Sequence, residues 1–335
     1  MNPLLDPAIL FFVLGVSAGL LKSNLEVPAP LSRFLSLYLL MALGLKGGFA
    51  LSRSGFDGQV AAGLACAVTL ALVVPALAWS VLKRLLPPFD AAGIAATYGS
   101  VSAVTFITAM HVLEKQGTPA GGHMAAAMAL MESPAIILAL ALAAGLRAKA
   151  AAAELRVGPG GVAAVAGGPA NHGIGAAIRE ALTDGGTLLL MGALAVGLIT
   201  GEAGAKSMNL FTGDLFKGLL AFFLLDMGLL TARHAGALRG LPPALLLYGV
   251  LGPLVHAALA LALATAAGLS VPDATILMVL AASASYIAVP AVLRHAVPEA
   301  RPALYIGLSL GLTFPFNLVV GIPLYAQVAG WALGG

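Results

Sequence analysis

The sequence predicts an all-α membrane protein with ten transmembrane helices arranged as two inverted five-helix repeats. Hydrophobic residues make up 60% of the 335 residues and charged residues only 9%, a composition typical of a polytopic membrane protein. Several apolar runs are long enough, at about 1.5 Å per helical residue, to cross a hydrocarbon layer roughly 30 Å thick. A polar motif also occurs twice at a fixed spacing, which indicates an internal duplication.

Ten apolar runs define the expected helices. They cover residues 7–21, 34–51, 60–82, 91–112, 124–146, 187–200, 210–231, 242–267, 273–293 and 303–328. No basic segment precedes the first run, so we expect it to remain in place and not to be a cleaved signal peptide. Residues 147–186 are rich in Ala and Gly and lack an apolar span, which predicts a cytoplasmic linker between repeats at 1–146 and 187–335.

The duplicated motif lies in the fourth and ninth runs. Ser100 to Ser102 and Ser283 to Ser285 are related by an offset of 183, and the first serine of each lies ten residues after an aspartate, Asp90 or Asp273. Five helices per repeat is an odd number. The second copy therefore starts from the opposite side of the membrane, and the repeats are inverted.

Basic residues predict the orientation, because Lys and Arg resist translocation and stay cytoplasmic. With both termini outside, the inner loops and their flanks hold 12 of the 17 basic residues. These are Lys22, Arg33, Lys83, Arg84, Arg147, Lys149, Arg156, Arg179, Arg233, Arg239, Arg294 and Arg301. The five that remain are Lys46, Arg53, Lys115, Lys206 and Lys217.

The two serine motifs predict a binding site at broken helices. Small residues permit a break, which exposes backbone N–H groups and a positive helix end to an anion. Hydroxyl groups and freed carbonyls can hold a small cation, so sodium is a candidate near Ser102, Ser283 and Ser285. The alternative is that Gly and Ser only allow close helix packing. Two patches at matching repeat positions favour binding.

Ionisable residues inside apolar runs are candidates for ion coupling. A charge at the centre of a membrane costs about 2.5 to 3.5 kcal/mol, so Glu132 is expected to face a cavity, bind a cation or be protonated. The alternative is that Glu132 is a neutral glutamic acid bonded to a neighbouring helix. Thr313, its repeat partner, and Asn317 are expected to line the same cavity. Lys46 and Asp226 could form an interhelical ion pair; alternatively, Lys46 reaches the outer surface and Asp226 is structural.

Other chemistries lack support in the sequence. Cys66 is the single cysteine, which excludes a disulfide framework and a cysteine-rich metal site. No pattern places a base beside a nucleophile, so we do not expect an enzyme. We also expect no nucleic-acid partner, because the basic residues are accounted for at the membrane surface. No cofactor is expected beyond a coupling ion.

The chain resembles the sodium-dependent bicarbonate transporters first recognised in cyanobacteria. The best matching stretches are Gly44 to Ala50, Gly99 to Ser102, Met131 to Pro134, Ala281 to Pro290 and Ala303 to Gly307. The resemblance implies a gate or scaffold of helices one, two, six and seven, and a substrate-carrying core of the other six. It also implies a homotrimer, elevator-like movement, sodium symport, a bacterial inner-membrane location and a PII-like regulatory partner.

The resemblance places the anion between the two helix breaks. The implied site residues are Gly99, Ser100, Val101, Ser102, Ala103, Ser283, Ala284, Ser285, Tyr286, Ile287 and Ala288. Three positions depart from the family pattern: Tyr286 replaces an aspartate, Glu132 replaces an aspartate, and Lys46 replaces a threonine. Lys46 could substitute for a bound cation, so the coupling ion is expected to be sodium or a proton, or coupling is absent.

Together these observations predict a secondary transporter of a small anion, with bicarbonate as the leading candidate. The alternatives within transport are another small carboxylate or a proton-coupled antiporter of related fold. A membrane receptor or scaffold that does not transport is the alternative from another class, but it would leave the duplicated broken helices without a purpose.

Overall fold

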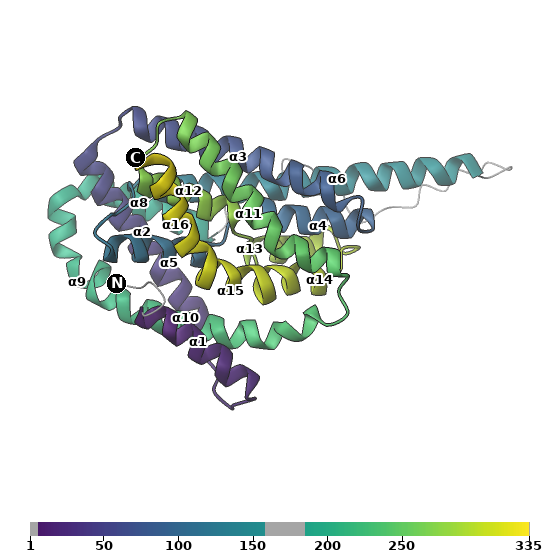
Figure 1. The fold of residues 1–335 in the computed structure, drawn as a ribbon, viewed down its shortest axis with the longest axis horizontal. Helices are drawn as coiled ribbons and strands as arrows, with labels where there is room; N and C mark the ends of the chain where they lie inside the picture. Colours follow the sequence, from purple (N-terminus) through teal and green to yellow (C-terminus); the bar gives the residue numbers. More distant parts are fainter. Residues whose placement is uncertain (1–5, 158–184, 335) are drawn as a thin grey trace.

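The computed structural model describes residues 6–157 and 185–334, which form helices and no strand. The longer helices are α1 (Pro7–Leu20), α2 (Ala29–Ser54), α3 (Gly58–Leu82), α4 (Pro88–Gly99), α5 (Ala103–Lys115), α6 (Met124–Val157), α8 (Gly185–Ser207), α10 (Asp214–Ala235), α11 (Pro243–Ala266), α12 (Val271–Ala282), α13 (Ala288–Ala296) and α16 (Ile322–Leu333). The short helices are α9 (Asn209–Thr212), α14 (Pro302–Ile306) and α15 (Phe314–Phe316). Figure 1 shows their arrangement.

The structure confirms a multi-pass, all-helical membrane protein. Eight helical segments in the described part of the chain are long and apolar enough to cross a membrane, while α1 and α12 are shorter apolar helices. The count of ten spans therefore stays a prediction. The expected runs 91–112 and 273–293 are each divided into two helices, α4 with α5 and α12 with α13.

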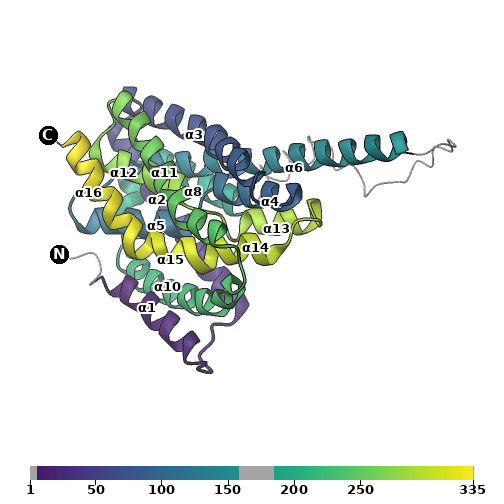
Figure 2. The same ribbon diagram turned by 45° about the vertical axis from the view of Figure 1, so that its right-hand side comes forward.

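Helix α6 is longer than the sequence led us to expect. It continues to Val157, past the boundary at residue 146, and projects beyond the other helices in both ribbon views (Figures 1 and 2). Residues 147–157 include five Ala, with Arg, Lys, Glu and Leu at all but one of the other positions. These are strong helix formers, although the segment is too polar for a membrane span. The rest of the expected linker, including Arg179, lies outside the described residues.

Helices α1, α2, α8 and α10 pack in pairs, α1 against α10 and α2 against α8; we call them the paired-helix group. Glycines lie at both contacts. A Cβ atom on Gly15 would lie 3.1 Å from the Cα of Gly228. One on Gly48 would lie 2.8 Å from the Cα of Gly197. The backbones therefore touch directly, as expected where small residues mediate helix packing in membranes.

The remaining helices, α3–α6 and α11–α16, hold the two breaks; we call them the broken-helix group. Helix α3 packs against α4 and α6, and α11 packs against α12 and α16. Every residue of α4 from Asp90 to Gly99 is buried, as is every residue of α12 from Asp273 to Ala282. This burial on all sides places the ends of both helices in the interior of the protein.

We predict that Gly48→Ala destabilises the protein by roughly 1–3 kcal/mol, the usual range for overpacking. The added methyl would overlap the Leu194 carbonyl oxygen on α8, and that backbone cannot move without separating the two helices. The measurement is the free energy of unfolding from SDS titration in mixed micelles. Gly192→Ala on α8 is the matched control, because a Cβ there meets nothing within 4 Å. Equal stability of the two variants would contradict the proposed contact.

Candidate functional site: two crossing helix breaks

The two serine motifs adopt the same backbone conformation. Helix α4 ends at Gly99, and Ser100 follows with φ −98° and ψ 175°. Helix α12 ends at Ala282, and Ser283 follows with φ −78° and ψ 166°. Both serines are thus extended where a helix would otherwise continue, so the predicted interruption of both helices is confirmed.

Two hydrogen bonds join the breaks to each other. The backbone N–H of Ser102 donates to Ser283 Oγ at 2.9 Å, and that of Ser285 donates to the Thr97 carbonyl oxygen at 2.8 Å. The side chains of Ser100, Ser102, Ser283 and Ser285 are all buried. The structure therefore brings together the serines that the sequence repeat singled out.

The second serine of each motif accepts a hydrogen bond from the first turn of the half-helix that follows. Ser102 Oγ accepts hydrogen bonds from the backbone N–H of Thr105 at 3.2 Å and from its hydroxyl at 2.9 Å. Ser285 Oγ accepts from the backbone N–H of Val289 at 3.3 Å. Helices α5 and α13 thus both begin at the crossing, where their positive ends can stabilise an anion.

Other predicted residues of the second motif lie in different surroundings. The Tyr286 ring is buried against Phe314, with 5.1 Å between ring centroids, and its hydroxyl lies 3.9 Å from Met227 Sδ on α10. The Ile287 side chain is 55% exposed, unlike those of Ser283 to Tyr286.

Glu132, Thr313 and Asn317 surround the crossing, but in ways the sequence did not predict. Glu132 is half-buried, and its backbone carbonyl accepts a hydrogen bond from Ser100 Oγ at 3.1 Å. Thr313 Oγ1 lies 2.6 Å from the Tyr98 hydroxyl and donates to the Gly249 carbonyl at 2.7 Å.

Asn317 completes the end of α12. Its amide nitrogen donates to the Ala282 carbonyl at 2.8 Å, and its amide oxygen accepts from the Tyr325 hydroxyl at 2.9 Å. The last carbonyls of a helix have no partner within the helix. Asn317 therefore satisfies a buried acceptor that the break leaves open.

Two aspartates anchor the helices that lead to the breaks. Asp90 Oδ1 accepts from the backbone N–H of Arg301 at 2.8 Å, just before α14, and Asp90 Oδ2 accepts from the Arg301 guanidinium. Asp273 Oδ1 accepts from the backbone N–H of Gly121 at 2.6 Å, just before α6. From the sequence, both aspartates were recognised only as markers of the repeat. Their shared distance from the serine motifs was the available signal of a shared role.

The proposed ion pair between Lys46 and Asp226 is wrong. Lys46 Nζ lies 2.6 Å from Glu114 Oε2 on α5, whereas Asp226 accepts a hydrogen bond from the Ser32 hydroxyl at the start of α2. Ser32 and Lys46 are fourteen positions apart on one helix, which is roughly 21 Å at 1.5 Å per residue. Asp226 therefore binds the start of α2, far along that helix from Lys46.

The chain matches a known protein family along most of its length. A model of the Na+-dependent bicarbonate transporter superfamily matches residues 7–330, which include both helix breaks and both helix groups. None of the curated proteins compared with the chain matches it.

We predict that Ser283→Ala destabilises the protein by roughly 1–3 kcal/mol, because it leaves the buried N–H of Ser102 without an acceptor. Ser309→Ala is the matched control. Ser309 is equally buried, but its hydroxyl donates only to carbonyls of its own helical segment. The free energy of unfolding in SDS titration measures both variants. A Ser283→Ala cost no larger than that of Ser309→Ala would show that the bond across the breaks contributes little.

Proposed function

Because the chain belongs to the Na+-dependent bicarbonate transporter superfamily, we propose that it carries bicarbonate across the bacterial inner membrane by alternating access, in symport with sodium. The anion binds between the two helix breaks. The observation that carries the proposal is the pair of hydrogen bonds that joins Ser102 to Ser283 and Ser285 to Thr97. One bond joins the start of α5 to the end of α12, and the other joins the segment before α13 to α4.

The chemistry of the crossing suits a small oxyanion. Backbone N–H groups at the starts of α5 and α13 supply donors and a positive field. The hydroxyls of Ser102 and Ser285 add polar groups that can reorient. Bicarbonate is small, planar and singly charged, so a site built from amides and hydroxyls can replace its hydration without a fixed cation. Serine hydroxyls and carbonyls freed by the breaks are the groups proposed to hold sodium.

Repeated contacts support an inverted duplication. Contact between α1 and α10 has a counterpart between α8 and α2, as it would if a two-fold axis exchanged α1 with α8 and α10 with α2. The anchors agree, because Asp90 binds the chain before α14 and Asp273 binds the chain before α6. Two halves of opposite orientation around one site are the usual basis of alternating access.

Movement is proposed to occur between the two helix groups. The broken-helix group contains the whole crossing, whereas the paired-helix group is held together by backbone contacts at Gly15 and Gly48. The first group would carry the anion as an elevator past the second. The paired-helix group is the proposed scaffold of a homotrimer.

We predict that Ser102→Leu and Ser285→Leu each abolish uptake of labelled bicarbonate into proteoliposomes without preventing membrane insertion. Leucine is favourable in a membrane but fills the space between the breaks and removes a polar group. Ser17→Leu is the control, since Ser17 is exposed on α1 and its hydroxyl bonds only the Val13 carbonyl. Normal uptake by correctly inserted Ser102→Leu and Ser285→Leu proteins would remove the crossing as the substrate site.

We predict that Glu132→Gln lowers the uptake rate by about tenfold, or about 1.4 kcal/mol in the barrier, without lowering protein yield. The change keeps size and hydrogen bonding but removes the ionisable group, so it tests coupling separately from helix contact. Uptake is compared in sodium and in choline with pH clamped on both sides. Glu299→Gln is the control. Glu299 lies in the loop between α13 and α14, outside the proposed spans, and pairs with Arg147 of α6. Wild-type sodium and pH dependence in Glu132→Gln would exclude coupling through Glu132.

A further inference from the structure

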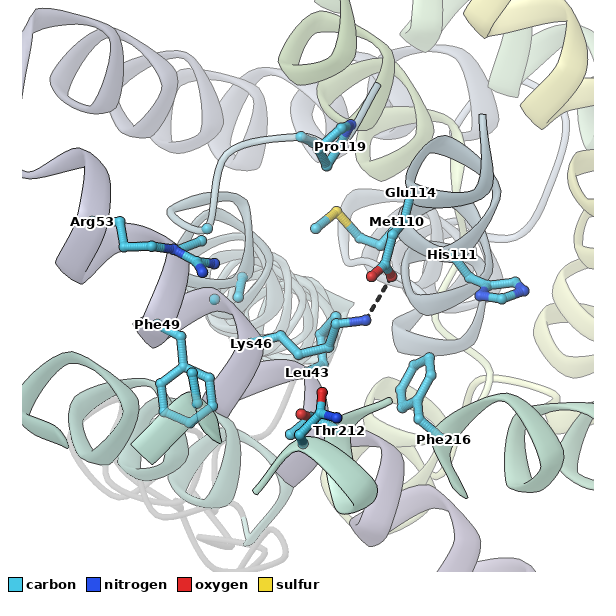
Figure 3. A pocket seen from close by; sticks show the side chains of 17 residues that line it. Leu43, Lys46, Phe49, Arg53, Met110, His111, Glu114, Pro119, Thr212 and Phe216 are labelled. Atoms are coloured by element: carbon cyan, nitrogen blue, oxygen red, sulfur yellow. Dashed lines mark hydrogen bonds and ion pairs between the residues drawn. The ribbon is translucent and has the colours of Figure 1, made fainter. Parts of the chain in front are cut away.

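A cavity of about 260 Å³ lies between the two helix groups, away from the crossing. Helix α2 contributes Lys46 and Arg53, α5 contributes His111 and Glu114, and α10 contributes Phe216. Figure 3 shows Lys46 and Glu114 extending toward each other across this space. An adjoining hollow shares Lys46, His111 and Glu114 and adds the exposed Lys217. The cavity is therefore lined by both groups that are proposed to move past each other.

Lys46 is held in the cavity by two contacts. Its ammonium lies 2.6 Å from Glu114 Oε2 and 5.0 Å from the centre of the Phe216 ring. The lysine side chain is 27% exposed and that of Glu114 is 50% exposed. An ammonium group has three N–H donors, and the Glu114 bond uses one. Lys46 can therefore donate to a second oxyanion from the open side of the cavity.

Three of the five basic residues that the orientation count left on the outer side line these spaces: Lys46, Arg53 and Lys217. Arg53 lines the cavity, Lys217 lines the adjoining hollow, and Lys115 follows Glu114 on α5. Arg53 and Lys217 make only exposed pairs, at 3.7 Å with Glu202 and 3.3 Å with Asp214. Such pairs are weak and screened by salt. These cations can therefore still raise the local concentration of a small anion.

Asp6 contacts two basic side chains near the end of α5, and neither of them is Lys46. Lys115 Nζ lies 2.8 Å from Asp6 Oδ2, and His111 Nε2 lies 3.6 Å from the same oxygen. Burial acts to raise the pKa of Asp6, but the hydrogen bonds from Lys115 and the Ala8 amide and the charge of His111 lower it on balance. Asp6 thus stays ionised at neutral pH and satisfies Lys115. Lys46, in contrast, is bound to the half-exposed carboxylate of Glu114.

From this arrangement we propose a second oxyanion site at Lys46, in which the Glu114 carboxylate is an internal competitor for the substrate. The inference rests on the proposed function, since the ligand is the same class of small planar oxyanion. A carboxylate and bicarbonate present the same O–C–O edge to an ammonium group. An incoming anion takes the place of Glu114 on Lys46, and Glu114 turns to solvent.

Displacement of Glu114 also changes the contact between the helix groups. The Lys46–Glu114 pair joins α2 of the paired-helix group to α5 of the broken-helix group. Glu114 lies twelve positions after Ser102 on α5, which is roughly 18 Å at 1.5 Å per residue. The cavity and the crossing are therefore separate places on one rigid helix. Anion binding at Lys46 therefore breaks the ion pair with Glu114 on α5. Helix α5 is also the helix whose first turn lines the crossing.

The test is binding of 13C-labelled bicarbonate to the full-length protein in lipid nanodiscs, followed by broadening of the bicarbonate NMR line. Ser285→Leu serves as the background, because it blocks the crossing. In this background we expect residual broadening, at least about tenfold weaker affinity after Lys46→Gln, and tighter binding after Glu114→Gln. Lys46→Arg keeps a cation and should keep binding even if Lys46→Gln fails to fold. Lys206→Gln, which removes an exposed outer charge that does not line the cavity, should keep binding as well.

Three outcomes would overturn the second site. They are no residual binding in Ser285→Leu, unchanged affinity after Lys46→Gln, or an equal loss after Lys206→Gln, which would indicate general electrostatic attraction. Failure of the proposed function gives a different result. If the crossing binds no bicarbonate, wild type and Ser285→Leu show the same broadening, while Lys46→Gln still removes it.

Discussion

The structure depends on how two interrupted helices satisfy their backbone polar groups in an interior without bulk water. Each unpaired N–H or C=O group in such a place costs several kcal/mol. Here each break supplies partners for the other: Ser283 Oγ accepts from the N–H of Ser102, and the Thr97 carbonyl accepts from the N–H of Ser285. Asn317 then completes the end of α12. The backbone groups at each break are therefore satisfied only when residues from both halves of the chain are in place.

This mutual dependence explains several features farther away. The crossing requires α4 and α12 to be buried on all sides, and Gly99 allows the first break to fit against Pro75 of α3, where a Cβ would lie 2.8 Å from the proline Cγ. The crossing also requires both leading helices to start at fixed positions. Asp90 and Asp273 supply this by binding backbone N–H groups of the opposite half. Local polar groups thus fix the register of the whole broken-helix group.

Much of this could be predicted from the sequence because it is local or periodic. Apolar runs indicated the helices, and the repeat at Ser100 and Ser283 indicated two breaks. Partners formed by tertiary packing could not be predicted, so Asp226 was considered as a possible partner of Lys46 and Glu114 was not. The extent of α6 was wrong for another reason: apolar content predicts membrane span, whereas helix formation continues through Ala, Lys and Glu regardless of span.

Two residues that depart from the family pattern, Lys46 and Tyr286, make contacts between the two helix groups. By the resemblance described above, Lys46 stands where relatives have threonine; it binds Glu114 of α5 across the boundary between the helix groups. Tyr286 stands where they have aspartate, and its hydroxyl lies 3.9 Å from Met227 of α10 across the same boundary. One substitution adds a positive charge and the other removes a negative charge. Both also change which side chains hold the two groups together. Each of the two positions therefore combines a change of charge with a contact between the helix groups, and a variant at either position alters both.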